Sequence, residues 1–200
     1  MNEYPVKNTT PSDSEIQHSF KTEVWETIRF IVIALIIVVP IRFFIAQPFI
    51  VSGESMDPTF QTGQYLIVDE LSYNIGNPKR GDVAIFKYPK NPTQYFIKRV
   101  IGLPGETVSI TEGHVSIKDS LGKVALELSE PYVEFTKNDT TDYTLGLGEY
   151  FMMGDNRAGS FDSRAWGPVQ KNLFIGKAFL RLFPFTKISF FSGLPSIHFC

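Results

Sequence analysis

The sequence predicts a mainly β protein, in which an N-terminal apolar helix precedes an antiparallel β-sheet domain. Three observations support this fold class. The longest apolar run extends from Phe30 to Val51, apolar and polar positions alternate beyond Pro48, and turn residues such as Pro104-Gly105 separate the alternating runs. No stretch outside the apolar run has convincing helical periodicity. A chain of 200 residues can bury a core, and it suits one domain with a smaller appendage.

The N-terminal part divides into a polar and an apolar segment. Residues 1–22 are polar with scattered charges and prolines, and we predict a disordered leader. Residues 23–47 are predicted to form a transmembrane signal-anchor helix, because the apolar run has about the 20 residues that span hydrocarbon. The alternatives are a buried core helix or a cleaved secretory signal, but no small-x-small cleavage site follows the run. Since acidic residues count little in the positive-inside rule, the basic residues Lys7, Lys21 and Arg29 favour a cytoplasmic N-terminus.

Residues 48–200 are predicted to form the main domain, with a small β insertion at about 106–150. Glu112-Gly113 is a hairpin turn signal inside that insertion, and residues 121–147 are expected to add short strands to it. The Phe-rich segment 179–191 is expected to be a core strand followed by a tail. Period-two alternation predicts strands at 64–68, 82–86, 94–101, 107–111, 114–118 and 150–153.

Composition excludes several classes of function. A net charge of −2 and a pI near 5.9 give no electrostatic footprint for nucleic acid. Cys200 is the only cysteine and the last residue, so an intrachain disulfide and a Cys-ligated zinc site are both excluded.

Ser55 is the first candidate for chemistry. It lies in the segment Ser52-Gly53-Glu54-Ser55-Met56-Asp57-Pro58-Thr59, directly after the apolar run. Glycine permits backbone conformations that a Cβ excludes and proline fixes φ, so this segment could hold the Ser55 hydroxyl in one exposed orientation. The alternative is a polar linker where the helix leaves the bilayer.

A serine nucleophile needs a base, and lysine is the best candidate here. None of the three histidines has an acid-bearing constellation nearby. Lys98 would share one face of a strand with Phe96 and Val100, and apolar neighbours lower the pKa of an amine. Starting from about 10.4, the pKa must fall by roughly 2–3 units for the amine to act as a base near pH 8. The alternative is an edge-strand lysine that deters aggregation.

A third polar cluster lies between Gly154 and Gly167, and it is either an exposed loop or the wall of a site. Asp162 and Arg164 would point the same way in an extended chain and could form an ion pair. Ser160 could exchange a hydrogen bond with a neutral lysine amine.

Taken together, these segments resemble the type I signal peptidase family, also called bacterial leader peptidases, the membrane-bound Ser/Lys proteases that remove secretory signal peptides. Four motifs occur in the family's order across residues 25–182, which makes the signal specific. They are Ser52-Gly-x-Ser55-Met-x-Pro-Thr59, Arg80-Gly-Asp82-Val-x-x-Phe86, Phe96-Ile-Lys98-Arg99-Val-Ile-Gly-Leu-Pro-Gly-Glu106 and Gly154-Asp-Asn-Arg-x-x-Ser160-x-Asp-Ser-Arg164-x-x-Gly167.

The resemblance implies a role for each candidate. Ser55 would be the nucleophile, Lys98 the general base, and Ser160 the group that orients the lysine amine. The pair of Asp162 and Arg164 would brace the site, and Met56 would help to shape shallow pockets for small side chains. Some members carry a hydroxyl residue two positions before the nucleophile, where it helps to hold the oxyanion. This chain has Gly53 there, which offers only backbone, so the second oxyanion donor beside the Ser55 N–H is not identified.

The resemblance also implies an acyl-enzyme mechanism with no cofactor and no metal. The expected partners are signal-peptide-bearing preproteins emerging from the export machinery and the lipid bilayer, and we expect a monomer. The expected location is the bacterial plasma (inner) membrane, crossed once, with the catalytic domain on the outer side. Two other interpretations remain. A self-cleaving Ser/Lys protease would carry a DNA-binding domain in place of the apolar run, and a membrane-tethered β binding module would not need Ser55, Lys98 and the Ser160–Arg164 cluster together.

Overall fold

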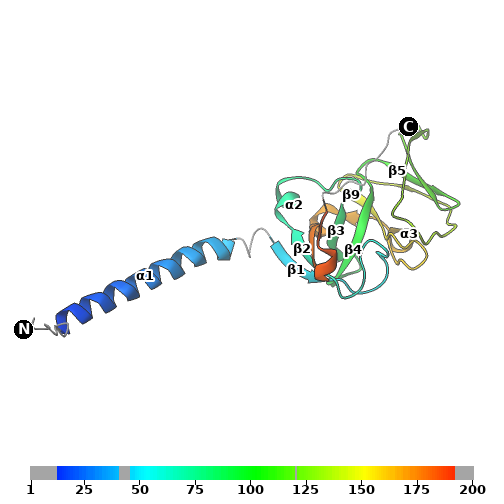
Figure 1. The fold of residues 1–200 in the computed structure, drawn as a ribbon. Helices are drawn as coiled ribbons and strands as arrows, with labels where there is room; N and C mark the ends of the chain where they lie inside the picture. Colours follow the sequence, from blue (N-terminus) through cyan, green and yellow to red (C-terminus); the bar gives the residue numbers. More distant parts are fainter. Residues whose placement is uncertain (1–12, 41–45, 120, 192–200) are drawn as a thin grey trace, which may run out of the picture. The chain divides into compact units, whose positions relative to one another are not determined.

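The computed structural model describes residues 13–40, 46–119 and 121–191 of the chain (Figure 1). The chain divides into two compact units, Met1–Phe43 and Phe44–Cys200. The first unit contains the helix α1 (Asp13–Pro40), and the second contains the β-sheets.

Helix α1 begins ten residues before the predicted start, so residues 13–22 of the expected disordered leader are helical. These ten residues contain no glycine or proline, and a helix can therefore continue through them. At the other end, the strand β1 (Ala46–Ile50) takes the last two residues of the helix predicted at 23–47. Pro48 lies in this strand, and β1 is the edge of its sheet, where a missing N–H is tolerated.

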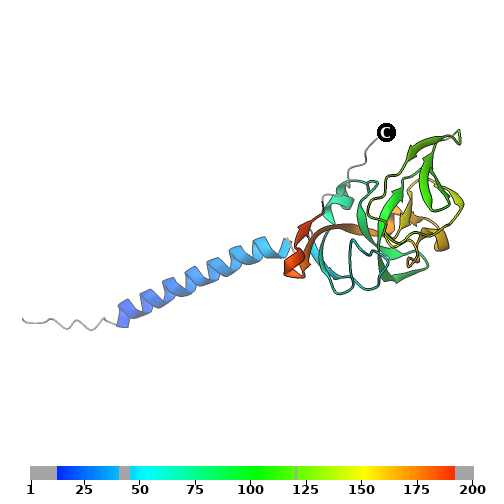
Figure 2. The same ribbon diagram turned by 45° about the vertical axis from the view of Figure 1, so that its right-hand side comes forward.

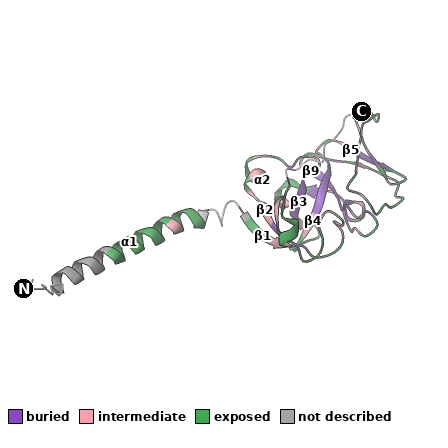
Figure 3. Cartoon of the chain, in the orientation of Figure 1, coloured by how far each residue is buried: buried purple, intermediate pink, exposed green. Residues whose placement is uncertain are grey.

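The described side chains of α1 are mostly exposed and apolar, as the green helix in Figure 3 shows. Phe30 is 73% exposed and Ile36 is 66% exposed. No helix in the described ranges has the combined length and apolarity needed to cross a membrane. Residues 41–45 of the predicted span lie outside the described residues.

Within the described residues, the second unit holds an eight-stranded antiparallel sheet in the order β1-β2-β11-β3-β4-β9-β10, with β12 paired to β11. Residues 179–183 of the segment expected to be a core strand belong to β11, which lies between β2 and β3 inside the sheet. The strands after β1 are β2 (Tyr65–Asp69), β3 (Val83–Tyr88), β4 (Asn91–Gly102), β9 (Glu149–Met153), β10 (Val169–Gln170), β11 (Phe174–Phe183) and β12 (Ser189–Phe190). The short helices are α2 (Leu71–Ile75), α3 (Ser163–Trp166), η2 (Lys171–Leu173) and η3 (Phe185–Lys187).

A second, four-stranded antiparallel sheet lies between β4 and β9 in the described sequence, and it falls in the range where the β insertion was predicted. Figure 2 shows its β5–β6 hairpin in green. Glu112 and Gly113 both have positive φ, 50° and 84°, as a two-residue hairpin turn requires. The strand order is β7 (Val124–Glu127), β6 (His114–Lys118), β5 (Thr107–Thr111) and β8 (Thr141–Thr144).

The two sheets share part of their core, which fixes the small sheet against the large one. Ile101 on β4 and Phe151 on β9 are fully buried in one cluster with Val108 and Ile110 of β5. The second half of β4 is buried, as its purple ribbon in Figure 3 shows. The prediction of a mainly antiparallel β protein is therefore confirmed.

Candidate active site

Ser55 lies in the loop between β1 and β2, and this loop is fastened at both ends. Met56 and Phe60 are completely buried, and the Phe60 N–H donates to the Met56 carbonyl at 2.8 Å. Gly53 has a φ of 96°, which a residue with a Cβ rarely adopts. Its N–H donates to Thr62 Oγ1 at 3.0 Å, and the Thr62 hydroxyl donates to the Gly53 carbonyl at 2.9 Å. The backbone that Gly53 was expected to offer is thus already engaged.

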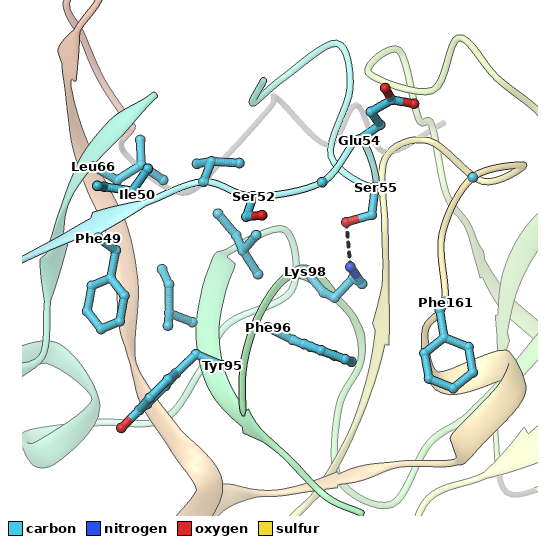
Figure 4. A pocket seen from close by; sticks show the side chains of 15 residues that line it. Phe49, Ile50, Ser52, Glu54, Ser55, Leu66, Tyr95, Phe96, Lys98 and Phe161 are labelled. Carbon is cyan, nitrogen blue, oxygen red and sulfur yellow. Dashed lines mark hydrogen bonds between the residues drawn. The ribbon is translucent and has the colours of Figure 1, made fainter. Parts of the chain in front are cut away.

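Lys98 lies on β4, inside the large sheet and opposite Ala84 of β3. Its side chain points toward Ser55 (Figure 4). Its Nζ lies 2.5 Å from Ser55 Oγ, and the residue is only 5% exposed. The Phe96 ring, two residues earlier on the same strand face, lies 5.5 Å from the amine. The sequence-predicted pair is therefore in hydrogen-bond contact.

The electrostatics of the site favour a neutral amine at Lys98. Burial lowers the pKa of Lys98 from its ordinary value of 10.5 to about 8, and the nearby Arg164 charge acts in the same direction. The negative charges of Asp162 and Asp155 oppose this shift by stabilising the ammonium. At a pKa near 8, a substantial fraction of the amine is neutral just above neutral pH.

A pocket of about 310 Å³ opens beside Ser55 and Lys98. Figure 4 shows apolar side chains around this pocket, which come from three strands and one loop. They are Ile50 of β1, Leu66 of β2, Phe96 of β4 and Phe161 of the loop after β9. The Ser52 and Glu54 side chains lie at the nucleophile loop beside it. An extended, mainly apolar segment could therefore approach the hydroxyl along this pocket.

Met56 does not line the pocket, although the sequence analysis placed it there. Its side chain is fully buried in a core cluster with Phe60, Leu66 and Val68. The turn at Ser55 directs the next side chain inward, so Met56 anchors the loop instead of facing a bound ligand.

Asp162 and Arg164 form the ion pair that the sequence predicted. Arg164 Nε donates to Asp162 Oδ1 and Arg164 Nη2 donates to Asp162 Oδ2, both at 2.8 Å. Asp162 Oδ2 also accepts the Gly154 N–H at 3.1 Å. Burial alone would raise the pKa of Asp162, but the hydrogen bonds and charge of Arg164 outweigh it, so the net shift is downward. Asp162 is therefore a fixed negative charge near the Lys98 amine.

Ser160 lies beside the pair but does not make the hydrogen bond to Lys98 that was expected. Its Oγ is buried and has no partner of standard geometry within the described residues. The hydroxyl is near enough to Asp162 to contribute to the lowering of that pKa. Its neighbour across the loop is Gly154, where a Cβ would come within 2.3 Å of Ser160 Oγ.

A second buried ion pair, between Arg99 and Asp155, was not predicted from the sequence. Arg99 Nε and Nη2 donate to the two Asp155 oxygens at 2.8 and 2.6 Å, and Thr59 Oγ1 of the nucleophile loop donates to Asp155 Oδ2 at 2.6 Å. Neither residue was given a role from the sequence. Their presence in two of the four quoted motifs was the available signal.

The polar cluster after β9 also holds the nucleophile loop by its backbone. The Asn156 N–H donates to the Ser55 carbonyl, and Asn156 Nδ2 donates to the Glu54 carbonyl, both at 3.1 Å. The Ser55 N–H, in contrast, donates no hydrogen bond among the described residues. This N–H is consequently left for a ligand.

A hydroxyl in contact with a buried amine, beside an apolar pocket on an antiparallel β fold, is the arrangement expected of a hydrolase with a serine and a lysine at its centre. The comparisons with known proteins agree with this class. Residues 24–183 match the family described as signal peptidase, peptidase S26. The chain therefore belongs to the signal peptidase family, peptidase S26, and it is a peptidase.

Curated relatives match over most of their length. Signal peptidase I of Leptolyngbya laminosa is 34% identical over 96% of this chain and 96% of that protein. Signal peptidase I P of Bacillus subtilis subsp. natto is 35% identical over 84% of this chain and 93% of the relative. A crystal structure of a signal peptidase I from Enterococcus faecalis V583 is 34% identical, covers 50% of this chain and 96% of that one, and has a TM-score of 0.42. The resemblance inferred from the four motifs is confirmed.

Proposed function

We propose that this protein is a membrane-bound serine endopeptidase that cleaves N-terminal signal peptides from exported preproteins after small residues. The observation that carries the proposal is the 2.5 Å contact between Ser55 Oγ and Lys98 Nζ beside an apolar pocket. Membership of the signal peptidase family supports the substrate class.

The proposed reaction begins with a proton transfer. The neutral Lys98 amine accepts the proton of Ser55 as Oγ attacks the scissile carbonyl carbon, and the ammonium then protonates the leaving amine. The acyl-enzyme is hydrolysed by a water molecule whose proton passes to the same amine, and the ammonium returns this proton to Ser55 Oγ as the bond from Oγ to the acyl group breaks. Ser55 and Lys98 are the only protein side chains that exchange protons in these steps.

The oxyanion of each tetrahedral intermediate needs preorganised donors. The Ser55 N–H is available for this purpose, as described above. The Gly53 N–H is not, because Thr62 Oγ1 already accepts it. The second donor must therefore come from outside the Gly53 backbone.

The pocket supports selection by size. Its wall beside Ser55 combines Leu66 and Ile85, which are buried in the core, with Phe96 at the edge of the core and the exposed Ile50. Such a wall accepts alanine, serine or glycine, whereas a larger side chain would overpack it at about 1–3 kcal/mol. We therefore expect small residues at the position before the cut and at the third position before it.

The N-terminal unit supports a location at the bacterial plasma membrane. Residues 30–39 of α1 are all apolar, and a helix that is hydrophobic all round is typically buried in a protein core or a membrane. We propose that the apolar segment in residues 23–47 anchors the enzyme in the bilayer with the catalytic unit on the outer side, where preproteins emerge, and that the enzyme acts as a monomer.

The test is processing of one preprotein by the full chain in detergent, with Ser55→Ala and Lys98→Ala beside the parent. The parent should yield one shortened product, and each variant should remain folded yet lose nearly all processing. A substrate with phenylalanine in place of the alanine before the cut should be processed poorly. Substantial activity of Lys98→Ala would refute the assignment of the base, and cleavage of the chain itself without cleavage of the preprotein would favour a self-cleaving protease.

A further inference from the structure

The connection between β7 and β8, residues 128–140, belongs to the small sheet, but several of its side chains point at the motifs of the active site. Of the four arginines in those motifs, Arg80 pairs with Glu106, which leaves three, namely Arg99, Arg157 and Arg164. Each of them is contacted by a different residue of this β7–β8 connection, as the following distances show.

Arg157 is held by Glu130 and Arg164 is held by Asp139. Arg157 Nη1 and Nη2 donate to the two Glu130 oxygens at 2.8 and 2.5 Å, and the side chains are almost completely buried. Arg164 Nη1 donates to Asp139 Oδ2 at 2.5 Å. Bidentate and charge-assisted hydrogen bonds of this kind fix the direction of a guanidinium plane.

Arg99 is covered by Tyr132, whose ring centroid lies 3.9 Å from the guanidinium carbon. The Tyr132 hydroxyl donates to Glu130 Oε1 at 2.8 Å, so one residue links the Arg99 and Arg157 contacts. The backbone adds a further link, since the Ala158 N–H donates to the Phe135 carbonyl at 3.2 Å. The β7–β8 connection is thus bonded along its length to the loop after β9.

The arginines also form hydrogen bonds with residues that lie beside Ser55. Arg164 is bidentate on Asp162, which accepts the Gly154 N–H. Arg157 Nε donates to the Gly154 carbonyl at 3.1 Å. Gly154 lies against the Ser55 carbonyl and the Ser160 hydroxyl, because a Cβ there would come within 2.3 Å of both oxygens.

We propose that the β7–β8 connection positions the active site, with Glu130, Tyr132 and Asp139 holding the three arginines that fix the nucleophile loop and Asp162. None of the three residues contacts Ser55 or Lys98, so they are positioning residues. The proposal rests on the proposed peptidase function and adds to it a role for the small sheet. That role explains why an insertion within the β domain places two carboxylates and one aromatic ring against three arginines of the site motifs.

The test compares three variants of the full chain in detergent, with a peptide substrate spanning a signal-peptide cleavage site with alanine before the cut. Asp139→Asn removes the negative charge that faces Arg164 with little change in side-chain shape, and Asp139→Glu keeps a negative charge at this position. Asp142→Asn is the matched control, because Asp142 forms its ion pair with Lys118 inside the small sheet. The readouts are kcat and KM per active site, the pH dependence of kcat/KM, and the melting temperature.

Asp139→Asn should lower kcat on the order of tenfold or more with a smaller change in KM, as a misplaced catalytic group does. The pH at which kcat/KM rises should also move. The charges that act on Lys98 are those of Asp162, Asp155 and Arg164, and a displaced Arg164 would neutralise Asp162 less completely. Asp139→Glu should recover most of the activity, and Asp142→Asn should match the parent.

A merely structural role predicts a lower melting temperature with kcat per active site and pH profile unchanged, and that result would overturn the proposal. Should Asp139→Asn fail to fold, Glu130→Gln is measured in the same way and the same outcomes apply. A parent chain without cleavage activity would overturn the proposed function and this inference with it, whereas an active parent and an unaffected Asp139→Asn would overturn the inference alone.

Discussion

Lys98 is subject to opposing influences that leave its amine close to the neutral form. Burial lowers the pKa of the Lys98 amine, whereas the negative charges of Asp162 and Asp155 raise it. If Lys98 is the general base, kcat/KM should rise with pH through a pKa of about 8. The measurement is the pH–rate profile of the full chain with a signal-peptide substrate. A rising limb near the ordinary lysine value would mean that the amine is not desolvated during the reaction.

The same shift has a consequence for stability. The folded pKa of Lys98 is about 8 and the unfolded value is about 10.4, so between these values the unfolded chain binds the extra proton and stability rises with pH. Below pH 8 the buried ammonium opposes folding by roughly 3 kcal/mol relative to an exposed lysine. Lys98→Met should therefore be inactive and at least as stable as the parent at pH 7.

Thermal unfolding at pH 7 and pH 10 checks this prediction, with Lys118→Met as a control on a partly exposed lysine. The stability advantage of Lys98→Met should shrink as the pH rises from 8 toward 10.4, because the parent then loses its penalty. A melting temperature several degrees below that of the parent at pH 7 would instead mean that the ammonium is charged and well paired.

Ser55, Lys98 and the Asp162–Arg164 pair could be predicted from the sequence because each lies in a motif with a recognisable chemistry. Met56 could not be assigned correctly, since the direction of a side chain in an irregular turn depends on the core beneath it. The partner of Arg157 is Glu130, which lies 27 residues away along the chain in a segment without a strong pattern. Long-range pairing of this kind leaves no local signal.

At the scale of elements, the strands with clear alternation were predictable, whereas only the end of β11, residues 179–183, fell in a segment expected to be a strand. The two-residue hairpin of β5 and β6 and the buried half of β4 follow directly from period-two patterns. In β11, register shifts interrupt the pairing with β2 between Ala178 and Leu180 and again between Arg181 and Phe183. Each bulge moves the following side chains to the other face, so the alternation disappears from the sequence although the strand is central.

The close approach of the loop after β9 to the nucleophile loop gives a prediction at this scale. Gly154→Ala would place a methyl group within 2.3 Å of the Ser55 carbonyl oxygen and Ser160 Oγ, and the backbone of the nucleophile loop would have to move. We expect kcat/KM to fall on the order of a hundredfold, as displacements of about 1 Å do. Gly146→Ala is the control, because its nearest neighbour is the end of the flexible Glu149 side chain at 3.2 Å. Equal activity of both variants would show that the two loops are not rigidly coupled.

At the scale of the whole molecule, the two units differ in how their apolar residues are used. In the β unit, buried clusters on both faces of the large sheet account for residues such as Phe60, Phe86 and Phe151. In α1 the described apolar side chains have no such cluster and remain exposed. Ser55 and Lys98 both lie in the β unit, so the proposed chemistry needs no group from the N-terminal unit, whose proposed role is to anchor the enzyme.

This division leads to a prediction about the location of the full chain. If residues 23–47 anchor the enzyme in a bilayer, the parent should stay in the membrane pellet after an alkaline carbonate wash and be released only by detergent. Ile33→Lys with Ile36→Lys should weaken the anchoring, because each lysine in the centre of a bilayer helix costs roughly 2.5–3.5 kcal/mol. The control is Ile75→Lys, which adds the same charge at a residue of the β unit that is 81% exposed. Release of the parent by carbonate alone would exclude an integral anchor, whereas release of the double variant with retained cleavage in detergent would show that anchoring and catalysis reside in separate units.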